Sequence, residues 1–328
     1  MTELLQRDLM ALQFDGAGGC DEATLQDVLS GPDGGPDTGF VWLHLKLDAA
    51  DTPNTLNQLN LDPFVIDALL AEETRPRCTV HGDGALINLR GVNLSPGAAP
   101  EDMVSVRFWV EERRVIGLRR RPLFAVSDLL ETSLGGNGPV TTSDLIAKLA
   151  LRLADRAEPV VASLNERIDA LEEMLDDAAA APPKGELADI RRVSIILRRY
   201  MFPQRDALTT FEIEDLFWIT DRDRSRVREA AERVTRLGEE LDAIRDRAQV
   251  VHDQIMDRRA ETMNRQMLVL SVVSAVFLPM GLLTGLLGIN VAGIPGASTP
   301  WAFWAVCGIL VAMGLVQLWL YRKLGLFK

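Results

Sequence analysis

The chain is poor in the residues that build metal and catalytic centres in soluble proteins. Its 328 residues include three cysteines and three histidines, which are scattered, and His44 and His81 have no companion at ligand spacing. No C-x-x-C or H-x-x-x-H motif is present, which argues against a tetrahedral metal site. A phosphate-binding loop, a dinucleotide-binding glycine motif and a nucleophile elbow are also missing. Because no nucleophile, base and oxyanion donors can be named, we do not expect an enzyme.

Charge is almost absent from the last fifth of the chain. No acidic residue follows Glu261, and after Arg265 the charged residues are Arg322, Lys323 and Lys328. All 47 acidic residues therefore lie in the front part, and the whole chain has a formal charge of −12. An acidic surface repels nucleic acid and attracts cations, although acidic residues also serve solubility alone.

Two long uncharged runs fill this last region, MLVLSVVSAVFLPMGLLTGLL (267–287) and WAFWAVCGILVAMGLVQLWL (301–320). As a helix, each would be about 30 Å long, the thickness of the hydrocarbon core of a bilayer. Tryptophans near both ends of the second run fit the aromatic belts at membrane interfaces. We therefore expect two membrane-spanning helices joined by a loop over 288–300.

Basic residues lie on the side of both runs that faces away from this loop. Arg258, Arg259 and Arg265 precede the first run, and the three basic residues of the C-terminus follow the second. The positive-inside rule then places both termini in the cytoplasm and the loop outside. The N-terminal segment lacks the order of a signal peptide, so we expect a multi-pass protein of the inner membrane with a cytoplasmic front part.

One face of the first predicted span consists mostly of small or polar residues. Steps of three and four trace it back from Gly288 through Gly285, Gly281, Leu278, Ser274, Ser271, Met267 and Asn264. Such a face suits either close helix packing or the wall of a wet path. Two helices cannot enclose a pore, so conduction would require several chains, and a simple membrane anchor is the alternative. Pro279 predicts a kink in this span.

A long helix, from about Asp221 to Gln266, is predicted ahead of the first span. Its apolar residues keep a three-four spacing, at Val227, Ala230, Val234, Leu237, Leu241, Ile244, Ala248, Val251 and Ile255. This stripe is typical of a coiled coil between chains, and a helix packed on its own domain would show it too. A separate row leads from Asn264 back through Asp257, Asp253 and Asp246. It suits a cation path, or else holds ordinary solvated or salt-bridged carboxylates.

The front part divides into a mixed domain and a helical region, which gives an α+β chain. Alternating or β-rich segments at 40–47, 78–83, 84–92, 103–112 and 114–120, with a helical stretch at 52–73, predict an α/β domain over 1–140. An antiparallel helical hairpin, with a kink or break at Pro203, and the long stalk helix then occupy 141–266. The transmembrane hairpin follows over 267–328.

This order of parts resembles the CorA superfamily of divalent metal ion transporters over the whole chain. The tripeptide Gly288-Ile289-Asn290, at the outer end of the first span, stands where magnesium members carry Gly-Met-Asn. Together with the residues that follow, it is similar to the ZntB-like branch, which is associated with zinc. The resemblance implies a funnel-shaped homopentamer without a cofactor, in which the first span lines the pore and the second surrounds it.

The resemblance also implies roles for individual residues. It places the pore mouth at Gly288, Ile289 and Asn290 and the helix kink at Pro279. Pore-lining positions would be Asn264, Met267, Ser271, Ser274, Leu278 and Gly281, which agrees with the face traced above. Zinc is then the expected cargo, with proton-linked import as a possibility for this branch. A magnesium or cobalt channel and a non-conducting scaffold remain the alternatives.

Overall fold

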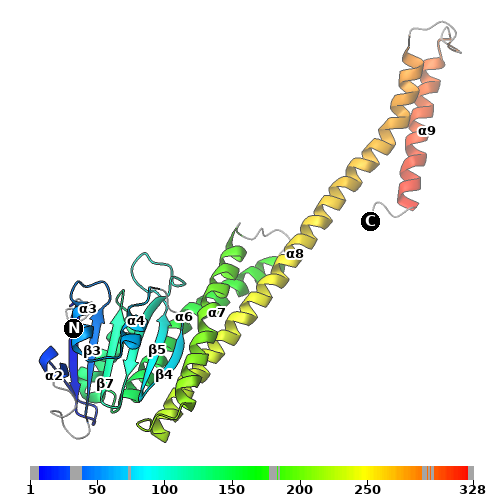
Figure 1. Cartoon of the computed structure of the whole chain (residues 1–328). Helices are drawn as coiled ribbons and strands as arrows, with labels where there is room; N and C mark the ends of the chain where they lie inside the picture. Colours follow the sequence, from blue (N-terminus) through cyan, green and yellow to red (C-terminus); the bar gives the residue numbers. More distant parts are fainter. Residues whose placement is uncertain are drawn as a thin grey trace. The chain divides into compact units, whose positions relative to one another are not determined.

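The computed structural model describes residues 7–29, 39–72, 75–176, 183, 185–289, 294, 296 and 299–323. The chain forms two units, Met1–His252 and Asp253–Lys328. Helix α8 (Asp221–Gly288) begins in the first unit and ends in the second (Figure 1). Its first residue is where the stalk helix was predicted to begin, and it continues unbroken into the first apolar run.

A seven-stranded sheet forms the centre of the first unit. Its strands are β1 (Leu9–Phe14), β2 (Cys20–Glu22), β3 (Phe40–Lys46), β4 (Arg77–His81), β5 (Gly84–Gly91), β6 (Val104–Val110) and β7 (Arg114–Arg119). The order is β2-β1-β3-β7-β6-β5-β4, and the pair β3–β7 is parallel while the other pairs are antiparallel. The five predicted strands are confirmed as β3 to β7, whereas β1 and β2 were not predicted.

The helical stretch predicted at 52–73 forms two short helices, α3 (Thr52–Gln58) and α4 (Pro63–Leu70). The division follows from local chemistry. Asn60 adopts a positive φ of 51°, which ends the first helix. The side chain of Asp62 then accepts a hydrogen bond from the backbone N–H of Phe64, and Pro63 supplies a first helical residue that needs no N–H partner.

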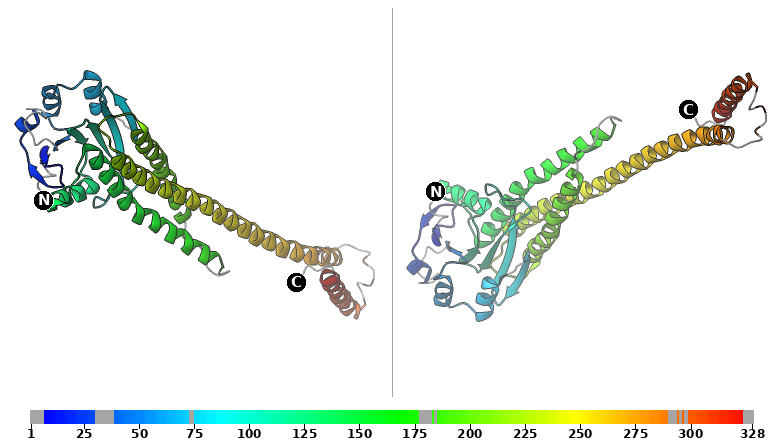
Figure 2. Two further views of the ribbon diagram at one scale, coloured as in Figure 1. Left: turned by 90° about the horizontal axis from the view of Figure 1, so that it is seen from below. Right: turned by 90° about the horizontal axis from the view of Figure 1, so that it is seen from above.

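Helices cover both faces of the sheet (Figures 1 and 2). One face packs against α3 and α4, and the shared core includes Leu43, Leu56, Leu69, Leu86 and Ile116. The helices near the other face are α5 (Phe124–Thr132), followed by a π-helical turn at Ser133–Asn137, α6 (Thr142–Asp176) and α7 (Glu186–Ile213). The sequence predicts the mixed α/β front, and the structure adds that α6 and α7, from the helical region that follows it, pack on strands β4 and β5.

Helices α6 and α7 form the expected antiparallel hairpin. Arg167, late in α6, forms ion pairs with Glu186 and Asp189 at the start of α7, at 2.6 and 2.7 Å. An apolar stripe along α6, from Ala150 to Leu175, is buried. Helix α7 continues through Pro203, so no break occurs there.

The apolar stripe of α8 is buried within its own chain. From Val227 to Val251 its members are at most 6% exposed, whereas the last, Ile255, is half-buried. Arginine–aspartate pairs join α8 to both helices of the hairpin, through Arg233 and Asp155 on one side and Asp242 and Arg198 on the other. The interpretation of this stripe as a seam between chains is therefore wrong, because α6 and α7 already cover it.

The second unit contains the end of α8 and the helix α9 (Ala302–Lys323). Both helices are long and apolar enough to cross a membrane, and none of their most apolar windows is buried by the protein. A surface of this length and composition is stable when lipid or other apolar helices cover it. The two predicted spans correspond to these segments.

One buried histidine gives the first unit a testable dependence on pH. His44 is fully buried between Trp42 and Phe108, and neither ring nitrogen has a hydrogen-bond partner in the described part of the chain. Burial, and secondarily the charge of Arg119, lowers the pKa of His44 well below its ordinary value. The folded chain therefore holds this imidazole neutral, while the unfolded chain protonates it below about pH 6.5.

We predict that lowering the pH from 8 to 5.5 destabilises the wild type more than the variant His44→Leu. The unfolded wild type takes up a proton that the folded form excludes, which costs up to about 1.4 kcal/mol for each pH unit below about 6.5. Melting temperatures of both full-length proteins in detergent, measured across this range, check the prediction. Parallel pH profiles for the two proteins would contradict it.

Candidate ion pathway

The predicted pore face of α8 lies opposite α9 within the second unit. Residues of α8 that α9 partly covers are Val272, Val276, Pro279, Met280 and Leu283. In contrast, the predicted lining residues are all exposed, namely Asn264, Met267, Ser271, Ser274, Leu278, Gly281 and Gly285. Because successive helical residues are turned by about 100°, the two sets point to nearly opposite sides of α8. Helix α9 thus leaves the small and polar face free.

Nothing in the described part of the chain crowds this face. A side chain added at Gly281 or Gly285 would meet no atom within 4 Å. Leu278 is 77% exposed, and among the residues of this face that follow Met267 in the sequence it has the largest apolar side chain. In the described part of the chain this face is open, so water in a closed assembly, another helix or lipid would cover it.

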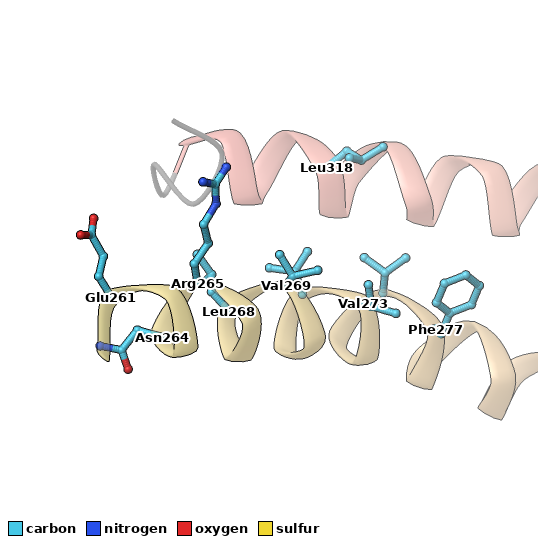
Figure 3. Close-up of a pocket in the computed structure, with 10 residues that line it drawn as sticks. Glu261, Asn264, Arg265, Leu268, Val269, Val273, Phe277 and Leu318 are labelled. Atoms are coloured by element: carbon cyan, nitrogen blue, oxygen red, sulfur yellow. The ribbon is translucent and has the colours of Figure 1, made fainter. Parts of the chain in front are cut away.

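A groove between α8 and α9 lies on a different side of α8 from the predicted pore face (Figure 3). Its lining residues are Glu261, Asn264, Arg265, Leu268, Val269, Val272, Val273, Val276, Phe277 and Leu318. It shares Asn264 with the predicted pore face, and its walls beyond the charged end are aliphatic or aromatic. Such walls offer no oxygen, nitrogen or sulfur ligand, so the groove suits lipid chains or another apolar helix rather than a cation.

The aspartates of the row predicted to lead to the first span, Asp246, Asp253 and Asp257, are solvent-exposed. Asp246, in the first unit, forms an ion pair with Arg245 at 2.7 Å, and this hydrogen bond raises the pKa of the arginine. Asp253 and Asp257, in the second unit, are also exposed. Across the described ranges, no three His, Cys, Asp or Glu side chains are grouped closely enough to hold a metal ion. These aspartates therefore attract cations as separate surface charges.

The predicted pore mouth is described in part. Gly288 is the last residue of α8, and Ile289 directly after it is 50% exposed. Asn290 lies outside the described residues, so its position at the mouth stays a prediction. The helix end at Gly288 agrees with the expectation that the tripeptide begins where the first span ends.

One polar residue of the spans was missed by the sequence analysis. Gln317, near the end of the second apolar run, is half-buried, and its Nε2 donates a hydrogen bond to the backbone oxygen of Ala275 at 3.4 Å. A lone amide in an apolar run was a usable signal, because polar side chains in membrane helices usually bond to a neighbouring helix.

Comparison with known proteins identifies the family. Residues 37–323 match the family described as "CorA-like Mg2+ transporter protein". The chain belongs to the CorA family. This result confirms the family that the sequence suggested, and the members of this family are transporters rather than enzymes.

The relatives include zinc transport proteins. The chain is 40% identical to the zinc transport protein ZntB of Pectobacterium carotovorum, over 95% of this chain and 94% of the relative. It is 42% identical to the divalent cation transporter CmaX of Pseudomonas aeruginosa, over 87% of this chain and 86% of the relative. These matches support the ZntB-like branch of the family.

Solved structures show the same fold. The full-length CmaX protein matches with a TM-score of 0.84 and 39% identity, over 97% of this chain and 98% of that one. The CorA magnesium transporter of Methanocaldococcus jannaschii matches with a TM-score of 0.79, over 96% of this chain and 98% of that one. At 16% identity, the second match bears on the fold alone.

We predict that a cysteine at Ser274 is accessible to water in the membrane-embedded protein. The variant Ser274→Cys, in a background whose native cysteines are replaced by alanine, should react with a charged methanethiosulfonate reagent at least about tenfold faster than Val276→Cys, because a thiol in lipid stays protonated and unreactive. Val276 is the matched control, since it lies on the same helix but faces α9. Equal labelling of the two variants would mean that the face of Ser274 is not wet.

Proposed function

We propose that this protein transports divalent cations across the inner membrane, with zinc as its cargo. The observation that carries the proposal is the small and polar face of α8, which is exposed and lies opposite α9. The relatives named as zinc transport proteins cover nearly the whole chain and support zinc. The family description names magnesium, which makes magnesium the second candidate.

The proposed transporter is a homopentamer with its first spans around a central axis. One hairpin cannot surround a water-filled path, since irregular or polar surfaces at membrane depth must face protein or water. Five copies would turn the face of Ser271, Ser274 and Gly281 inward and place α9 toward lipid. Both termini would lie in the cytoplasm, so that residues 1–266 form the cytoplasmic part and 267–328 the membrane part.

Amide oxygens at the mouth would receive the cation with its water shell. In the proposed assembly, each chain contributes one Asn290 to a ring around the axis. A ring of amide dipoles attracts a hydrated cation more weakly than a ring of carboxylates, so the ion can enter and also leave. The spans contain no Asp, Glu, His, Lys or Arg between Met267 and Leu320. Any link to protons would therefore involve groups outside the membrane, such as His252, Asp253 and Asp257.

We predict that purified protein in liposomes takes up zinc and that Asn290→Ala lowers this uptake by at least about tenfold, because the ring of oxygens at the mouth is lost. Uptake of zinc, magnesium, cobalt and nickel, each with and without an imposed pH gradient, is the measurement. Thr299→Ala, which removes another polar side chain of the same loop, is the control and should transport like wild type.

Three other outcomes of this experiment are informative. Magnesium uptake without zinc uptake would establish the second candidate. Zinc uptake that ignores the pH gradient would exclude proton coupling. If liposomes that contain the wild-type protein take up no more cation than protein-free liposomes, the chain is a membrane-anchored scaffold and the proposal is overturned.

A further inference from the structure

Pro279 deprives one backbone carbonyl of its partner in the middle of the first span. In an α-helix, the carbonyl of residue i−4 accepts a hydrogen bond from the N–H of residue i. Pro279 has no N–H, so the carbonyl of Ala275 loses its helical donor. No water is present in the hydrocarbon core to replace it, and proline is tolerated in such helices where a neighbouring group bonds the freed carbonyl.

The structure supplies this group from the other helix. The Nε2 of Gln317, on α9, donates to the freed oxygen of Ala275 at 3.4 Å. An amide is suited to this role, because the carbonyl needs an N–H donor and the uncharged side chain costs less in the membrane than a lysine or arginine. Gln317 thus replaces, across the helix pair, the bond that Pro279 removes within its own helix.

Close packing of the two helices puts Gln317 within reach. A side chain added at Gly314, one turn before Gln317, would lie 3.0 Å from the Cε of Met280. The absence of a side chain there lets α9 approach α8 beside the proline. Two contacts therefore hold α9 against α8 next to Pro279. Gln317 bonds to Ala275, which precedes the proline in the sequence, and Gly314 lies near Met280, which follows it.

Pro279 is also next to the predicted ion path. Leu278 directly precedes it and Gly281 follows it by two residues, and both belong to the exposed face opposite α9. A bend of α8 at Pro279 would therefore move these residues relative to the axis of an assembly. The distance of 3.4 Å between Nε2 and the oxygen is at the long end of the range for an N–H donor.

We propose that Gln317 is a positioning residue that sets the bend of α8 at Pro279 and, through this bend, the rate of cation movement. The inference rests on the proposed transport function. Gln317 itself is not expected to contact the cation, since it belongs to α9, which covers the side of α8 opposite the predicted lining residues. Its effect should depend on whether residue 279 can supply the missing N–H.

A double-mutant cycle tests this dependence. Gln317→Met keeps the length of the side chain but removes the donor, and Pro279→Ala restores an N–H that can bond Ala275 within the helix. We expect Gln317→Met to change the rate of zinc uptake by liposomes at least about threefold in the wild-type background, the shift that an average interhelical hydrogen bond in a membrane produces. In the Pro279→Ala background the same substitution should change the rate by less than about 1.5-fold.

The controls separate this inference from the proposed function. Leu315→Met introduces the same residue at an exposed position of α9 and should transport like wild type. Melting of the four proteins in detergent reports on the bond without transport, and Gln317→Met should lower the melting temperature only when Pro279 is present. Failure of wild type to move any cation would end the transport proposal, and the melting cycle would then decide on the bond alone.

Two results would overturn the inference. One is Gln317→Met with wild-type transport and melting. The other is an effect of Gln317→Met that is equally large with Pro279 and with alanine at this position, because the substitution would then act through general packing and not through the freed carbonyl. Rescue by Gln317→Asn is not expected, since the shorter side chain cannot reach the oxygen.

Discussion

The structure depends on one constraint, which is that hydrocarbon offers no hydrogen bonds to the backbone. A span must therefore satisfy its own N–H and C=O groups, and α8 does so by remaining helical from Asp221 to Gly288. Charged residues are confined to the flanks of the two spans for the same reason. At Pro279 helix α8 cannot bond the carbonyl of Ala275 itself, and Gln317 of α9 donates the hydrogen bond instead. The second helix thus completes the first as well as covering it.

Much of the first unit could be predicted because its pattern is local. The strands β3 to β7 alternate or are rich in branched residues and are separated by turn residues, so their positions follow from short-range chemistry. Strand β1, LMALQF, lacks that alternation and is defined by its pairing with β3, which is distant in sequence. Strand β2 has three residues, too few to show a period. Pairing partners of this kind leave no trace in composition.

The stripe on α8 shows where periodicity stops being informative. A three-four spacing establishes that one face of a helix is buried, but it does not identify the surface that covers this face. Here the covering surface is α6 and α7 of the same chain, and a side chain added at Gly238 would lie 3.4 Å from the ring of Phe202. An oligomer must therefore be held by other surfaces, of which the uncovered length of α8 after Val251 and the spans themselves are exposed.

The residues of the candidate pathway are a prediction from the sequence, and the structure adds what surrounds them. Size and polarity pick out Ser271, Ser274 and Gly281 from the sequence, whereas the side taken by α9 follows from packing at Val272 and Val276. The sequence analysis missed the role of Gln317 because its hydrogen-bond partner is a backbone oxygen, and every residue type has one. The tripeptide is recognisable from sequence, but a single chain holds no information on how its copies meet around an axis.

An uncharged span also bears on the energy source of the proposed transporter. A membrane potential is worth about 2.3 kcal/mol per elementary charge for each 100 mV, and therefore about 4.6 kcal/mol for a divalent cation. With a negative interior, this free energy favours import through any path that admits the ion. In the proposed orientation, the acidic front, part of a chain with a net charge of −12, would add attraction on the cytoplasmic side. A pore without ionisable residues thus needs no proton to draw a divalent cation inward, and protons would act through titratable groups outside the spans.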